Sequence, residues 1–107
     1  MSAFNEDLTR EMIVRLVNTC ADVREAKPGT KAFAVATAHF TGMAHGAHFA
    51  LRAMGISPGA APFAVEMDVI DAIRAHGDRP PHSTMNAEYK VWLPAVTDDL
   101  LAKWVAA

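Results

Sequence analysis

The chain has 107 residues, of which 51% are hydrophobic and 21% charged, and its formal net charge at pH 7 is −2. This composition excludes disordered and fibrous proteins and predicts one globular, all-helical domain over residues 1–107. Lys and Arg are spread along the chain without a basic block, which argues against a nucleic-acid partner, and a single cysteine excludes an intrachain disulfide.

The first amphipathic segment predicts a helix over residues 6–27. Asn5 suits the N-cap, Glu6 and Asp7 suit the first turn, and Pro28 ends the segment. The preceding residues lack the basic region and apolar run of a signal peptide, so we expect a cytoplasmic protein.

Residues 32–51 carry no charge and predict a second helix, which starts after Thr30 and ends near Met54. Gly55 favours a left-handed C-cap, with Ile56 supplying its apolar contact. The stretch is about as long as a membrane span, but it contains three histidines and is rich in alanine rather than leucine. We therefore expect a core helix and no membrane association.

A third helix is predicted over residues 63–76, and the glycine- and proline-rich residues 77–84 predict an exposed loop. The fourth helix is predicted over residues 86–105. Pro94 removes a hydrogen bond inside it, but the apolar residues keep one register across Pro94, so we expect a continuous helix that is kinked there. The predicted fold class is all-α, a compact four-helix domain arranged as a bundle or an orthogonal variant.

Helical projection of the second helix reveals a narrow polar stripe, which comprises Thr37, Thr41, His45, His48 and Arg52. Two interpretations stay open: the stripe is a solvated face or an interface, or His45 and His48, neighbours at i and i+3, bind a metal or a ligand. A metal would need further ligands, for which the chain offers His76, His82, Asp68 and Asp71.

His39 projects to the other side of this helix, into a predicted groove of small residues formed by Gly42, Gly46 and Ala50. His39 and His48 lie on opposite faces and cannot share one metal within a monomer. Either Gly42 and Gly46 let another helix approach closely, or His39 lines a pocket as an acid, a base or an axial haem ligand.

Glu66 lies within the apolar arc of the third helix, where a carboxylate needs a partner. Either the N-terminal end of its own helix stabilises it, or it forms a buried pair with His39, as in proton-transfer sites. Cys20 lies on the apolar side of the first helix, which predicts a small buried side chain. The sequence contains no phosphate loop, zinc-protease motif, EF-hand loop or nucleophile elbow, so no catalytic residue and no metal ligand is assigned.

The leading hypothesis is a non-enzymatic helical protein that acts through protein–protein interaction, as a homodimer or larger homo-oligomer or with another protein. The second helix has apolar or small residues over more than half its circumference, and three apolar residues project away from the expected core faces, namely Val14, Val91 and Leu101. The alternative is a small-molecule, metal or haem-binding bundle, with or without catalytic activity, that uses His39 with Glu66 or His45 with His48. The leading hypothesis requires no cofactor.

Overall fold

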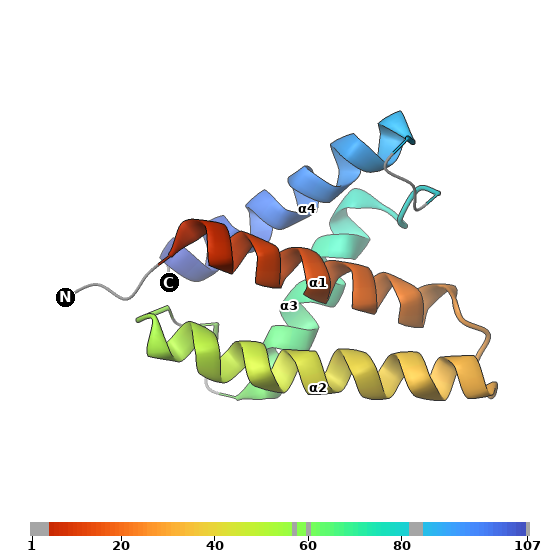
Figure 1. Ribbon diagram of the computed structural model, residues 1–107, viewed down its shortest axis with the longest axis horizontal. Coiled ribbons are helices and arrows are strands. Elements are labelled where there is room, and N and C mark those ends of the chain that lie inside the picture. The colour runs from red at the N-terminus through yellow and green to blue at the C-terminus, as the bar shows by residue number, and fades with distance from the viewer. Residues whose placement is uncertain (1–4, 57, 60, 82–84, 107) are drawn as a thin grey trace.

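A computed structural model describes residues 5–56, 58–59, 61–81 and 85–106, and within these ranges every regular element is a helix. The elements are α1 (Glu6–Glu25), α2 (Lys31–Ala53), α3 (Pro62–His76) and α4 (Ala87–Ala106), as Figure 1 shows. The Cα radius of gyration is 13.7 Å, close to the roughly 13 Å expected for a compact chain of this length. The predicted all-α, compact four-helix fold is confirmed.

Local hydrogen bonds fix the helix ends at the predicted places. The Asn5 side chain accepts from the Leu8 amide at the start of α1, and Thr30 accepts from the Phe33 amide at the start of α2. At the end of α2, Gly55 has φ +79°, and the Ile56 amide donates to the Leu51 carbonyl at 2.9 Å. This is the predicted left-handed cap, and Ile56 is buried.

Helix α4 runs through Pro94 without a break, which confirms one continuous helix. The bend at Pro94 stays a prediction. Among the three residues expected to project outward, Val91 is exposed and Val14 is half-buried, but Leu101 is buried. The expectation for Leu101 was wrong because α4 packs against both α1 and α3 and so buries a wider arc than a single stripe.

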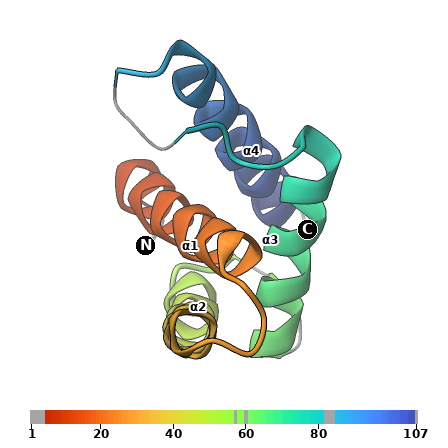
Figure 2. The same ribbon diagram turned by 90° about the vertical axis from the view of Figure 1, so that its right-hand side faces the viewer.

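Helices α1 and α3 form the centre of the arrangement, since each of them contacts the other three helices. The end-on view in Figure 2 shows α1 between α2 and α4, with α3 along one side. Helices α2 and α4 make no contact with each other among the described residues. The side of α2 that points away from α1 and α3 is therefore uncovered.

The core fills the space between these helices with side chains that are almost fully buried. Its largest members are Trp104, Ile13, Leu16, Leu51, Ile73, Leu100, Val17, Val65, Val69 and Val96. Within the described residues, none of the helices combines the length and the apolar character needed to cross a bilayer.

Candidate functional site

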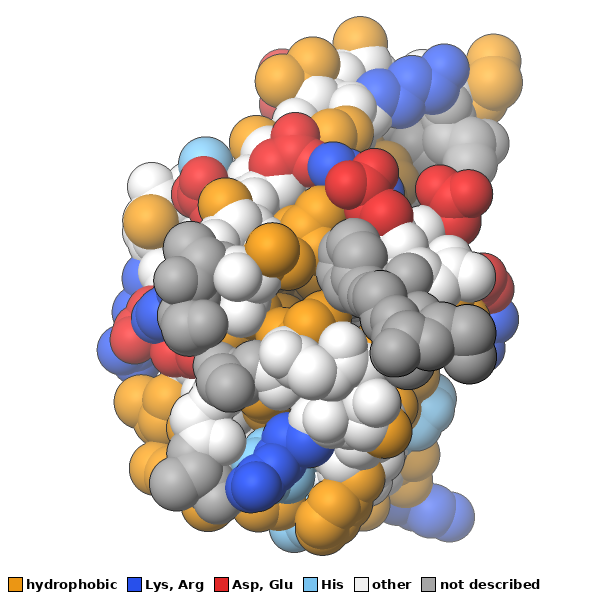
Figure 3. All heavy atoms as spheres, turned by 90° about the vertical axis from the view of Figure 1, so that its left-hand side faces the viewer, with side chains coloured by type: hydrophobic (Ala, Val, Ile, Leu, Met, Phe, Trp, Pro, Cys, Tyr) orange, Lys and Arg blue, Asp and Glu red, His pale blue; other side chains and the backbone are white. Residues whose placement is uncertain are grey.

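The uncovered side of α2 carries an uncharged surface, here called the α2 outer face. Its exposed members are Ala32, Ala34, Val35, Ala38, His39, Gly42, His45, Gly46, Phe49 and Ala50. Val35 is 59% exposed and Phe49 is 66% exposed, although both are large apolar residues. Figure 3 shows hydrophobic side chains and histidines at the bottom of the view, where α2 and the start of α3 lie, together with Lys or Arg side chains and no visible acidic side chain.

Five small residues follow one another at every fourth position of the α2 outer face, namely Ala34, Ala38, Gly42, Gly46 and Ala50. Larger residues flank this row, with Val35 and His39 on one side and His45 and Phe49 on the other. The predicted groove of Gly42, Gly46 and Ala50 therefore lies on the outside of the molecule. No atom comes within 4 Å of a Cβ built on Gly42 or Gly46, so none of the described residues packs closely on either glycine.

The candidate buried pair of His39 and Glu66, one of the two alternatives for Glu66, was wrong, because His39 is exposed on the α2 outer face. Glu66 is half-buried and accepts a hydrogen bond from the hydroxyl of Thr41, whose Oγ1 lies 3.1 Å from Oε1. Helix α2 buries the side with Phe40 and Leu51, which remove far more apolar surface from water than glycines do. This choice points Thr41 toward α3 and His39 outward.

The predicted polar stripe of α2 is divided between the interior and the surface. Thr37 and Thr41 are half-buried, His48 is 2% exposed, and His45 and Arg52 are exposed. The His45 Nδ1 lies 2.8 Å from the Thr41 carbonyl oxygen, whereas Thr37 Oγ1 and His48 Nδ1 are buried without a hydrogen-bond partner among the described residues. The stripe as a whole is therefore not a solvated face.

No group of three or more His, Cys, Asp or Glu residues placed to hold a metal occurs among the described residues. Asp68 instead accepts hydrogen bonds from Lys103 Nζ and Trp104 Nε1, and His76 pairs with Asp99. Of the other two candidate ligands, Asp71 is exposed and His82 lies outside the described residues.

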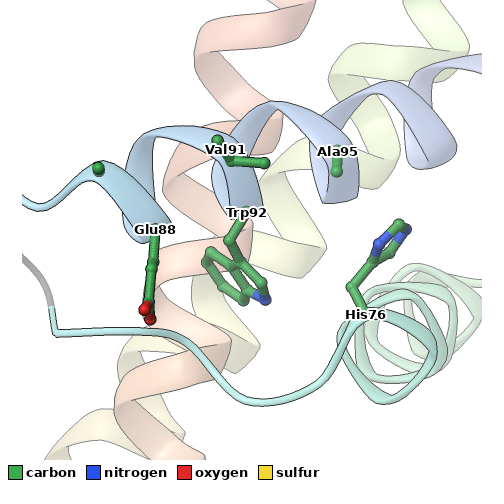
Figure 4. A pocket seen from close by; sticks show the side chains of 6 residues that line it. His76, Glu88, Val91, Trp92 and Ala95 are labelled. Atoms are coloured by element: carbon green, nitrogen blue, oxygen red, sulfur yellow. The ribbon is translucent and has the colours of Figure 1, made fainter.

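A second feature, which the sequence analysis missed, is a cavity of about 520 Å³ beside α4 that is widely open to solvent. It is lined by His76, Ala87, Glu88, Val91, Trp92 and Ala95. Figure 4 shows the Trp92 ring between the side chains of Glu88 and His76. The outward projection of Val91 was its one sequence signal, but the His76 wall comes from α3 and depends on the tertiary structure.

The segment that follows α3, residues 77–79, is bound to α1 and to α4. It thereby holds the Trp92 side chain, which lines the cavity, in place. Trp92 Nε1 donates to the Gly77 carbonyl at 2.9 Å. Arg79, whose side chain is 3% exposed, donates to both carboxylate oxygens of Glu25 and to Asp22. Burial lowers the pKa of Arg79, but these bonds outweigh it and the net pKa is raised. The positive charge of the guanidinium is compensated by Asp22 and Glu25, and its role is to attach the segment after α3 to α1.

Cys20 is buried in the core, as predicted. Desolvation raises the pKa of its thiol to about 11, with a smaller contribution from Glu66 and an opposing one from Arg24. A thiol in this state is a poor nucleophile at neutral pH.

Comparison of the chain with protein-family models, with curated proteins and with solved structures finds no match.

Proposed function

We propose that the protein acts by protein–protein interaction and that the α2 outer face binds the same face of a second copy. The observation that carries the proposal is the pair of exposed glycines, Gly42 and Gly46, in the middle of a 23-residue helix. A glycine inside a helix destabilises it by about 0.5–1 kcal/mol relative to alanine. In the isolated chain a Cβ at either position would meet nothing, so packing within the monomer does not account for them.

Close packing of a second helix gives these glycines a role. The small residues at every fourth position form a groove along the i±4 direction, bounded by the rows that contain Val35 and Phe49. Helices whose i±4 rows interdigitate cross at about −50°. In a twofold dimer, the groove of each copy would receive the flanking side chains of the other, and both Phe49 rings would leave water.

The electrostatics favour a second copy as the partner. No Asp, Glu, Lys or Arg lies between residues 32 and 51, and the exposed Lys31 and Arg52 lie at the two ends of α2. The middle parts of two copies of the α2 outer face therefore meet without like-charge repulsion. The helix is about 34 Å long by its rise per residue, and a single helix face covers less than the roughly 800 Å² per partner of a standard interface. We therefore expect a weak dimer that forms with increasing concentration.

Sedimentation equilibrium from about 5 to about 500 μM tests the proposal over the range expected for a weak complex. Wild type should shift from monomer to dimer, and Ala50→Glu should stay monomeric because it places a charge in the groove. Ala102→Glu is the matched control, an exposed alanine of α4, and should dimerise like wild type. A wild type that is monomeric throughout, or two variants that behave alike, would contradict self-association through this face.

A further inference from the structure

The cavity beside α4 has the size and lining of a small-molecule site, and it is separate from the α2 outer face. Its volume of about 520 Å³ falls within the roughly 300–1,000 Å³ typical of ligand pockets. It is formed by α3 and α4, whereas the α2 outer face belongs to a helix that α4 does not touch in the described part of the chain. The proposed ligand site and the proposed dimer contact therefore use different residues and can be tested separately.

The cavity is already formed in this conformation. Trp92 is 7% exposed, and the bond from its indole N–H to Gly77 fixes the ring. Gly77 is followed by Asp78 and Arg79, which are bound to Arg24 and to Glu25 of α1. A site whose walls are held in this way loses little conformational freedom on binding.

The lining favours a ligand with an apolar group. Ala87, Val91 and Ala95 recur at four-residue spacing along α4 and form an apolar wall next to the Trp92 ring. Val91 is 72% exposed, so an apolar group lying on this wall would remove its side chain from water. Such burial is favourable by about 25 cal/mol per Å² of apolar surface.

The charges around the cavity favour a cation. Glu88 is the sole carboxylate among the lining residues that the structure describes, and no Lys or Arg lines the cavity. Glu88 makes no ion pair with any of the described residues, whereas the His76 side chain is paired with Asp99. An ammonium group at the Glu88 end would meet an available carboxylate.

We propose that this cavity binds a small organic ammonium ion, with its apolar group on Val91 and Trp92 and its ammonium group at Glu88. Three probes of nearly equal shape separate charge from shape, namely 4-methylbenzylamine, 4-methylbenzyl alcohol and 4-methylbenzoate. Titration followed by ¹H–¹⁵N NMR reports binding through the Trp92 indole N–H. The amine should bind about tenfold more tightly than the benzoate, with the alcohol between them.

Glu88→Gln should weaken amine binding about three- to fivefold and leave the alcohol unchanged, because it removes the charge but keeps the shape. Val91→Ala should weaken the binding of the amine and of the alcohol alike, because it removes part of the apolar wall. Val91 is exposed, so its truncation does not disturb the core. Asp71→Asn is the control, an exposed carboxylate outside the lining, and should bind like wild type. Equal affinity for the three probes, no movement of the Trp92 signal, or unchanged amine binding in Glu88→Gln would overturn the proposal.

Discussion

Arg79 and Glu25, 54 residues apart in the chain, form a two-pronged ion pair in which Nε lies 2.9 Å from Oε2 and Nη2 lies 2.8 Å from Oε1. The same guanidinium also bonds to Asp22 and to both side-chain and main-chain oxygens of Asn18. The geometry requires the planar fork of arginine, which lysine lacks. This cluster attaches the segment after α3 to the C-terminal half of α1.

Replacing Arg79 with alanine should lower the free energy of unfolding by about 2 kcal/mol, because several charge-assisted hydrogen bonds are lost together. Arg79→Lys should recover less than half of the loss. The neighbouring Arg24 is the control, because it binds one exposed carboxylate, Asp78, and Arg24→Ala should cost less than about 1 kcal/mol. Urea unfolding measures the free energy of unfolding of all three variants. Equal decreases for Arg79→Ala and Arg24→Ala would contradict a special structural role of Arg79.

Thr37 and Thr41 lie one turn apart on α2, and replacing each with valine should change the stability of the protein in different ways. Thr41 donates to Glu66, whereas Thr37 Oγ1 is buried without a partner among the described residues. Thr41→Val should destabilise by about 1 kcal/mol, and Thr37→Val should be neutral or stabilising because it removes an unpaired hydroxyl.

Thermal or urea unfolding of both threonine variants provides the measurement. A double-mutant cycle with Glu66→Ala, which removes the acceptor, should show coupling for Thr41 and none for Thr37. His39→Ala should leave stability nearly unchanged, since His39 is exposed. Coupling between His39 and Glu66 would contradict the arrangement described above.

The buried thiol of Cys20 should make stability fall at alkaline pH. Because burial raises its pKa from 9.0 to about 11, the unfolded chain loses the thiol proton at a lower pH than the folded chain does. The unfolded state is thereby favoured as pH rises from about 9 to about 11, with a total effect of about 2–3 kcal/mol.

Cys20→Ala isolates this contribution, because all other ionisable groups are the same in both proteins. The decrease in unfolding free energy from pH 7 to pH 11 should be smaller in the variant by about 2–3 kcal/mol. Parallel pH profiles for the two proteins would contradict it. Reaction of Cys20 with a thiol reagent at pH 8 should also be slow in the folded protein and fast in urea.

The double variant Gly42→Ala, Gly46→Ala should have opposite effects on the monomer and on the proposed dimer. At low concentration it should stabilise the chain by about 1–2 kcal/mol, since alanine favours the helix and its Cβ has open space at both positions. At high concentration it should weaken association, because two methyl groups separate the helices. Unfolding and sedimentation on the same samples test both effects, and a variant that dimerises more tightly than wild type would contradict the proposed contact.

Features that depend on neighbouring residues could be predicted from the sequence. The N-caps at Asn5 and Thr30 and the left-handed cap at Gly55 each rest on hydrogen bonds that span three to five residues. Continuity of α4 through Pro94 followed from the register of its apolar side chains. Such signals are local, and they determined the number, the order and the ends of the helices.

The orientation of α2 and the partners of its polar residues were decided by tertiary structure. The uncharged stretch of α2, residues 32–51, has no strongly preferred side. Its orientation therefore depends on the larger apolar area of Phe40 and Leu51, which α1 and α3 cover. That choice buried His48, placed Thr41 on Glu66, and turned His39 and the glycines outward. The cavity beside α4 arises in the same way, because His76 joins the α4 residues through the packing of α3. The sequence by itself determined four helices and their ends, and the competition for buried apolar area between helices decided which faces remained free to bind.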